Sequence, residues 1–163
     1  MEKQFCSLCK SKAQSKCGLC ECVVCKKCAH YVAEDTFYYL PEIPTELSHG
    51  VYCPQCFAAT IKPQLDIYEE TLARAKNVDV FSKKQSKETR LVKRSNKVIS
   101  VKNCTDYDEL ILRLAFIAAQ ENFNTIFDLD IKSKKVKNAA YSNLIWDGTA
   151  RPASFDNKRK IFD

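Results

Sequence analysis

The chain has no long apolar run, and nothing at its start resembles an export signal. Its most apolar stretch, 111–119, is interrupted by Arg113 and is much shorter than the roughly 18 residues that a membrane-spanning helix needs. The first residues, Met-Glu-Lys-Gln-Phe-Cys, contain neither an apolar segment nor a small-residue cleavage site. We therefore expect a soluble, cytoplasmic protein, in a compartment where thiols stay reduced.

Residues that mark enzymes are also scarce. Three glycines do not supply a glycine-rich phosphate-binding loop. The two histidines, His30 and His49, both lie in the N-terminal third, so no Ser/His/Asp set is indicated. Asp128 and Asp130 alternate with apolar residues, which places them on the solvent side of a strand without a third carboxylate or a histidine nearby. We expect no catalytic activity.

Cysteine, in contrast, is abundant. Eight of the ten cysteines form four C-x-x-C pairs within the first 56 residues: Cys6/Cys9, Cys17/Cys20, Cys25/Cys28 and Cys53/Cys56. Two thiolates separated by two residues can reach one metal ion across a tight turn, and zinc prefers four such ligands in a tetrahedron. Disulfides and an iron–sulfur cluster are the alternatives, but repeated C-x-x-C in a reducing compartment favours zinc. All-cysteine zinc sites are usually closed, so the metal is expected to be structural.

The order of the pairs predicts how they share metal ions. Only four residues separate the second pair from the third, so these two neighbours can hardly surround the same ion. Alternate pairs should therefore combine. This interleaving joins distant parts of the first 56 residues, a segment too short to form a large apolar core. The prediction is two Zn²⁺ ions, zinc 1 on Cys6, Cys9, Cys25 and Cys28, and zinc 2 on Cys17, Cys20, Cys53 and Cys56.

Two further residues lie close to these ligands. Cys22 lies between the second and third pairs and could replace Cys20, although the C-x-x-C spacing favours Cys20. His30 follows Cys28 by two residues and could also act as a ligand. We expect a spare thiol at Cys22 and a surface or supporting residue at His30.

The formal net charge of +6 raises the question of a nucleic-acid partner. Eight thiolates and two Zn²⁺ together lower this charge by four units, to about +2. Lysines are interspersed among the predicted ligands, where they would offset the anionic zinc–thiolate centres. The same lysines could instead form a phosphate-binding patch.

The segment 17–28, with one cysteine pair before it and one after it, resembles the FYVE-type zinc finger over residues 1–58. The resemblance rests on the four pairs and the four-residue central gap, whereas RING and PHD fingers usually include a histidine ligand. It implies a small two-zinc fold of the kind found among small-GTPase effectors, acting at membranes or with trafficking-type partners.

This chain departs from FYVE domains that bind phosphatidylinositol 3-phosphate. Residues 13–16 and 50–52 replace their basic motifs, the first gap is short, and residues 1–73 contain no arginine. Specific phosphoinositide binding needs convergent cationic donors and is not expected, while diffuse attraction to an acidic membrane surface stays open.

Residues 59–77 are expected to form a linker helix. Apolar residues recur there at helical spacing, and Pro63 should lie in its first turn or bend it. We expect the apolar side of this helix to pack on the zinc finger before it or on the domain after it. The alternative is that it forms the contact surface of a dimer.

An α+β domain is predicted for 78–163. Strand-like runs at 78–81, 90–92 and 98–101, with a lysine-rich hairpin loop at 82–88, precede a helix capped by Thr105 or Asp106. Two strands follow, the first with Phe127, Leu129 and Ile131 on one face, which indicates a β-β-β-α-β-β sheet with one covering helix. Segments 125–130 and 144–150 resemble bacterial YbjQ-like domains described as heavy-metal-binding.

Taken together, these features favour a protein-interaction or adaptor module with structural zinc, acting on a protein partner. The first alternative is a nucleic-acid-binding zinc protein whose lysines contact phosphates. The second is a RING-like ubiquitin-ligase component, by analogy with other cross-braced fingers.

Overall fold

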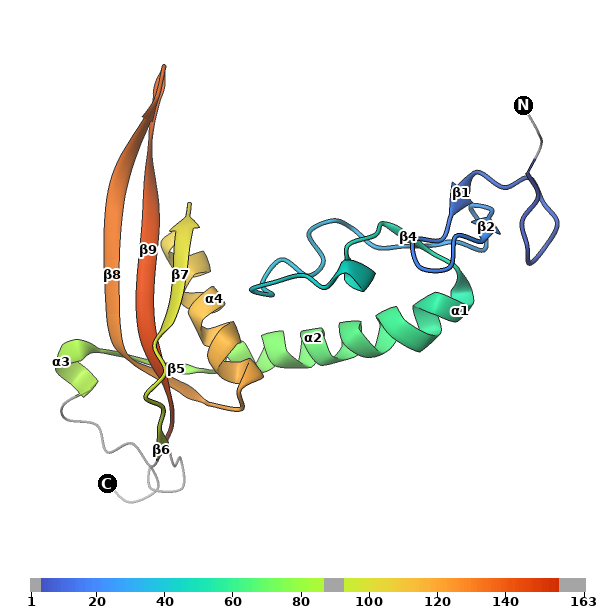
Figure 1. The fold of residues 1–163 in the computed structure, drawn as a ribbon. Helices are drawn as coiled ribbons and strands as arrows, with labels where there is room; N and C mark the ends of the chain where they lie inside the picture. Colours follow the sequence, from blue (N-terminus) through green and yellow to red (C-terminus); the bar gives the residue numbers. More distant parts are fainter. Residues whose placement is uncertain (1–3, 87–92, 156–163) are drawn as a thin grey trace. The chain divides into compact units, whose positions relative to one another are not determined.

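The computed structural model describes residues 4–86 and 93–155 (Figure 1). The chain divides after Glu69 into two compact units, and this boundary falls inside a long helix. We call these the N-terminal unit and the C-terminal unit. The finer division into 1–58, 59–77 and 78–163 stays a prediction.

The N-terminal unit has short strands and a core made partly of cysteine. Strand β1 (Ser15–Lys16) pairs with β2 (Val23–Val24), and β3 (His30–Tyr31) pairs with β4 (Val51–Tyr52), both antiparallel. A single 3-10 turn, η1, covers Thr45–Leu47. The buried residues of the N-terminal unit include four cysteines and several apolar side chains: Cys6, Cys17, Cys25, Cys53, Val24, Phe37, Leu47 and Tyr52. So few apolar side chains form a small core, which is the situation in which a metal typically stabilises a fold.

A helix leaves this unit directly from the last cysteine pair. It consists of α1 (Pro54–Cys56), the π-helical segment η2 (Phe57–Ile61) and α2 (Lys62–Ala75). It begins earlier than the expected residue 59, because Cys53 caps it through Sγ, which accepts a hydrogen bond from Cys56 N (3.4 Å), and Pro54 occupies its first turn. Pro63 lies in the first turn of α2, where the helix passes out of its π-helical segment.

Up to Glu69, where the N-terminal unit ends, the apolar side of this helix packs on that unit. Ile61 and Tyr68 are buried. The Tyr68 ring meets Phe37 edge-on at 5.3 Å, and its hydroxyl accepts a hydrogen bond from Tyr39 N at 3.3 Å. In the described part of the chain, no helix has the length and apolar character needed to cross a bilayer.

The C-terminal unit is a mixed five-stranded sheet with one long covering helix (Figure 1). Its elements are β5 (Asp79–Ser82), α3 (Lys83–Ser86), β6 (Lys93–Arg94), β7 (Ile99–Cys104), α4 (Tyr107–Gln120), β8 (Thr125–Asn138) and β9 (Tyr141–Ser154). Strand β9 is central: β8 pairs with one side of it, and β6 and β7 pair with the other. Strand β5 lies parallel to β8. The small α+β fold with a mixed sheet agrees with the predicted fold class.

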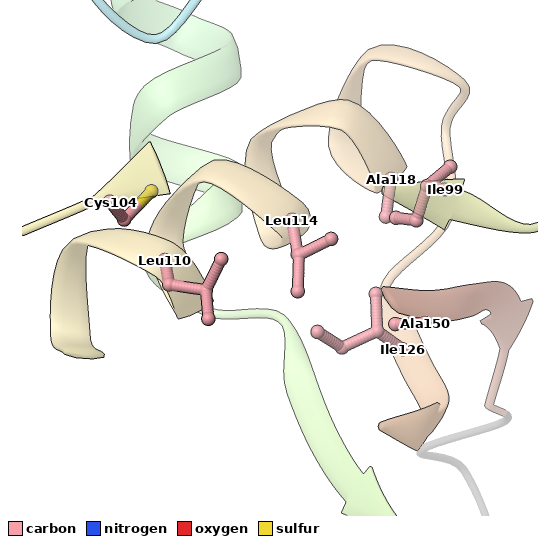
Figure 2. Close-up of a cluster of buried hydrophobic side chains, with 7 residues drawn as sticks. All are labelled: Ile99, Cys104, Leu110, Leu114, Ala118, Ile126 and Ala150. Carbon is pink, nitrogen blue, oxygen red and sulfur yellow. The ribbon is translucent and has the colours of Figure 1, made fainter. Parts of the chain in front are cut away.

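Helix α4 covers one face of this sheet. Asp106 caps the helix by accepting a hydrogen bond from Asp108 N at 2.6 Å, so Asp106 rather than Thr105 is the cap. Figure 2 shows the buried cluster beneath it, in which the helix contributes Leu110, Leu114 and Ala118, and the strands contribute Ile99, Cys104, Ile126 and Ala150.

Two details of the sheet differ from the sequence-based expectation. The predicted hairpin loop at 82–88 instead begins with helix α3, and β5 pairs with β8 rather than with the next strand along the chain. Strand pairing is decided by tertiary contacts, and parallel pairing requires the long crossover that includes α4. The predicted strand 90–92 lies outside the described residues, and β6 begins at Lys93.

A β-bulge corrects the predicted face of β8. The register against β9 shifts between Phe127 and Asp130, and Asp128 has a φ of 54°. One extra residue reverses the alternation, so Ile126 joins the covered cluster with Leu129 and Ile131 packed against it. The expectation that Phe127 shares this face was wrong.

Candidate metal centre

Cysteines distant in sequence come together in two groups of four. The first group is Cys6, Cys9, Cys25 and Cys28, and the second is Cys17, Cys20, Cys53 and Cys56. Within each group all four sulfur atoms lie within 4.8 Å of one another. These are the two ligand sets predicted from alternate pairs, and within the described residues they are the only clusters with this property.

The sulfur distances suit a tetrahedral zinc ion. A Zn–S bond of about 2.3 Å places the corners of a tetrahedron about 3.8 Å apart. Cys20 Sγ and Cys53 Sγ are 3.8 Å apart, and Cys9 Sγ and Cys25 Sγ are 3.4 Å apart. A disulfide would require about 2.05 Å, and all ten cysteines are free thiols. Each group could therefore hold one metal ion, consistent with two Zn²⁺.

The first pair of each group forms the same kind of tight turn. In the first turn, Lys10 N donates to Cys6 O (3.1 Å), and in the second, Glu21 N donates to Cys17 O (3.0 Å). Lys10 and Glu21 both have positive φ, 61° and 58°. This left-handed conformation folds the chain back so that both sulfurs of a pair face the same point. The cysteine spacing alone did not indicate these two residues, although each follows the first cysteine of its pair by four positions.

The second pair of each group lies in a helical turn. Cys28 N and Ala29 N both donate to Cys25 O, at 3.1 and 2.9 Å. Cys53 caps α1, and Phe57 N donates to its carbonyl oxygen at 2.9 Å. Each site thus combines one tight turn with one helical turn, and both backbones are held by hydrogen bonds of their own.

Short strand pairs lock the two sites to each other. The β1–β2 pair carries the Cys17–Cys20 turn at its closed end, and Cys25 follows β2 directly. Antiparallel pairing of His30 with Tyr52 brings Cys28 of the first site and Cys53 of the second to the same end of β3–β4. Unfolding of either site should therefore disturb the other.

The thiols of each group have divergent acidities. Hydrogen bonds from the backbone N–H groups of Cys9 and Leu8 lower the pKa of Cys6 to about 6. Burial opposes ionisation of Cys17, but backbone N–H groups of Cys20 and Cys53 outweigh it and lower the pKa of Cys17 to about 6.

The later cysteines show the opposite shift. Side-chain contacts with Cys9 and Cys25 raise the pKa of Cys28 to about 12, and burial followed by contact with Cys53 raises the pKa of Cys56. Four adjacent sulfurs repel one another when ionised, and a central dication would let all four ionise.

Three nearby residues lie outside both groups. His30 stacks flat on Phe57, with ring centroids 4.3 Å apart. Cys22 is half-buried, and its pKa is raised to about 12 by burial and by contact with Cys20 and Cys53. The His49 ring lies edge-on to Tyr52 at 6.3 Å, and His49 N donates to the Tyr52 hydroxyl at 3.1 Å. The sequence pattern gave no sign of this contact.

No protein-family model, curated protein or solved structure matches the chain. The FYVE-type and YbjQ-like resemblances therefore stay predictions. The geometry shows that the N-terminal unit contains two potential metal-binding cysteine groups, as zinc fingers do.

Proposed function

We propose that the chain is a non-catalytic adaptor of the cytoplasm whose N-terminal unit, held by two structural zinc ions, binds a protein partner. In each of the two cysteine groups, four thiolates would hold one zinc ion. Binding of the ion would supply folding free energy. Four sulfur ligands leave a zinc ion no open position for substrate, which favours a structural role.

The observation that carries this proposal is the exposure of large apolar side chains on a small unit. Phe5 is 59% exposed and Tyr31 is 58% exposed. Leu8, Tyr38 and Ile43 are also exposed. Aromatic side chains are enriched at protein interfaces because they bury a large area with few rotatable bonds.

A surface hollow in the same unit offers a second contact point. It has a volume of about 260 Å³ and lies in the segment between the sixth and seventh cysteine ligands, lined by Ala33, Glu34, Phe37, Ile43, Leu47, Ser48, His49 and Gly50. Phe37 and Leu47 are buried beneath it, whereas Ile43 is exposed at its edge. An apolar side chain of a partner fits such a hollow better than an ionic headgroup does.

The test is quantitative affinity capture with the full, zinc-loaded chain. Tyr31→Ala and Ile43→Ala should each reduce recovery of a specific partner at least tenfold, because exposed anchors dominate binding energy. Tyr141→Ala is the matched control, since Tyr141 is 78% exposed but belongs to the C-terminal unit. Zinc content and circular dichroism should stay unchanged in all three variants.

Partner recovery that is insensitive to both N-terminal substitutions would contradict the proposal. Recovery of a ubiquitin-conjugating enzyme, lost in the same two variants, would support the RING-like alternative instead. Loss of binding to acidic vesicles without loss of a protein partner would favour a membrane surface.

A further inference from the structure

Strands β8 and β9 continue well beyond the rest of the C-terminal unit (Figure 1). Strand β5 pairs with β8 only between Thr125 and Leu129, and β7 pairs with β9 only between Trp146 and Ala150. Five residue pairs, from Lys134/Ile145 to Asn138/Tyr141, therefore form a ribbon of two strands. At about 3.4 Å per residue this ribbon extends about 17 Å. We call residues 132–145, which comprise these five pairs, the connecting turn, and Lys132 and Ser133 at their base, the β-ribbon.

The β-ribbon is strongly and uniformly basic. It contains four lysines, Lys132, Lys134, Lys135 and Lys137, and no acidic residue occurs between Ile131 and Trp146. All four side chains are exposed. Exposed strand edges are often protected by charged side chains, especially lysine, and the lysines of the β-ribbon would serve that purpose. Four lysines without an acidic residue in the same segment also create a positive field that attracts a partner of opposite charge.

The lysines lie on both faces of the β-ribbon. The alternation of β8 places Lys135 and Lys137 on one face, where their cross-strand neighbours are Leu144 and Ser142. Lys132 and Lys134 lie on the other face, near Asp147, whose carboxylate is 3.4 Å from Lys134 Nζ. A flat anionic surface such as a membrane could contact only one of these faces at a time.

A groove with two anionic walls accommodates both faces together. A single sheet layer with its side chains is about 10 Å thick, and the major groove of B-form DNA is about 12 Å wide and admits a two-stranded ribbon. The major groove of A-form RNA is too narrow and deep for such an element. We propose that the β-ribbon binds duplex DNA by inserting into the major groove, with lysines of each face contacting the phosphates of one strand.

This function is separate from the proposed protein contact of the N-terminal unit. The lysines of that unit lie between the cysteines of the two sulfur groups, where they would offset the charge of metal-bound thiolates. The lysines of the β-ribbon adjoin no group of thiolates, and their acidic neighbours among the described residues are Asp147, beside Lys134, and Asp130, near Lys132. The protein contact of the N-terminal unit and the DNA contact of the β-ribbon can therefore be tested independently.

Fluorescence anisotropy with a 24-base-pair DNA duplex tests the proposal on the full, zinc-loaded chain. If four phosphates are contacted, the logarithm of affinity should fall with the logarithm of salt with a slope of about −3.6. That corresponds to a loss of affinity on the order of 100-fold between 50 and 200 mM salt. Glutamine at Lys132, Lys134, Lys135 and Lys137 should bring this slope close to zero.

Two matched variants separate loss of contact from loss of fold. Arginine at the same four positions keeps the charge and should keep both affinity and slope. Glutamine at four exposed N-terminal lysines, Lys10, Lys12, Lys16 and Lys26, removes equal charge elsewhere and should change the slope by less than one unit. A smaller variant, Lys135→Gln with Lys137→Gln, leaves the Lys134–Asp147 pair intact and should reduce the slope by about two.

Several results would overturn the proposal. Absence of duplex binding at 50 mM salt would do so, as would binding abolished by the N-terminal variant but not by the β-ribbon variant. Tighter binding of an RNA duplex than of a DNA duplex would exclude the major-groove arrangement. Ribbon-dependent binding to phosphatidylserine vesicles in place of DNA would identify a membrane as the partner.

Discussion

Gly18 lies directly against the side chain of His49. A Cβ atom at Gly18 would come within 2.3 Å of His49 Cγ and 2.4 Å of its Cβ. These are atoms close to the backbone, so His49 cannot relieve the contact by turning a flexible end away. The contact joins the Cys17–Cys20 turn to the segment just before β4 and Cys53, so the two halves of the second metal site meet there.

Gly18→Ala should therefore weaken the second metal site. The turn between Cys17 and Cys20 would have to shift, and we expect zinc affinity at one of the two sites to fall about tenfold or more, as for other residues that support ligands. Competition with a chromogenic chelator would measure this. Gly50→Ala is the control in the same unit, because its Cβ would meet only Val32 O at an ordinary 3.7 Å.

Substitution at Cys20 and Cys22 should have opposite outcomes. Cys20 belongs to the second sulfur group and Cys22 does not. Cys20→Ser should lower zinc content from two ions to one or fewer per chain, because serine is a poor zinc ligand at neutral pH. Cys22→Ser should keep two ions by elemental analysis. Equal loss in both variants would show that Cys22 is a ligand.

Removing the metal should unfold one unit and spare the other. Structural zinc contributes apparent free energy on the order of 10 kcal/mol, which the small core of the N-terminal unit cannot replace. The C-terminal unit has an apolar core beneath α4. The single tryptophan, Trp146, lies in that unit beside Tyr107, with ring centroids 5.4 Å apart.

Tryptophan fluorescence therefore reports the C-terminal unit alone. Excess chelator should leave the Trp146 emission unchanged while amide protons of residues 4–56 lose protection from hydrogen exchange. A change of both signals at the same chelator concentration would show that the two units unfold together.

Gly148 should not tolerate a side chain. Its Cβ would come within 2.9 Å of Leu110 Cδ2, and Leu110 is fully buried beneath α4. We expect Gly148→Ala to destabilise the C-terminal unit by about 1–3 kcal/mol, the usual cost of overpacking. Urea denaturation followed by Trp146 emission measures this. Gly148→Ala combined with Leu110→Val, which frees space, should recover part of the loss.

Asp147 should make the C-terminal unit more stable at neutral than at acidic pH. A hydrogen bond from Asn103 N (2.8 Å), followed by Lys134, holds the pKa of Asp147 below its ordinary value. The stabilisation is present above the pKa of the unfolded chain, about 3.9, and is lost as the pH falls through the lower pKa of the folded chain.

Asp147→Asn should remove this contribution. The urea midpoint of the variant should lie below that of the wild type at pH 7, and the difference should narrow as the pH falls below about 3.9. A difference that persists unchanged at pH 2.5 would show that the carboxylate charge is not responsible.

Local signals were sufficient for most elements of the C-terminal unit. The apolar spacing of α4 and its Asp106 cap are properties of short segments, and the structure has the helix there. The bulge at Asp128 could not be expected from alternation, because an inserted residue has the same composition as a regular strand residue. The parallel pairing of β5 with β8 depends on a contact across more than 40 residues, which no local pattern encodes.

The composition of the two cysteine groups was accessible from spacing alone, since the distance between two thiols across a tight turn is set by backbone geometry. The number of cysteines in each group and their interleaved order therefore follow from the order of residues in the chain. The contact between Gly18 and His49, the shared positive φ of Lys10 and Glu21, and the projection of the β-ribbon beyond its sheet arose only on folding. Each depends on which distant segments pack together, and packing is a property of the whole chain rather than of any window within it.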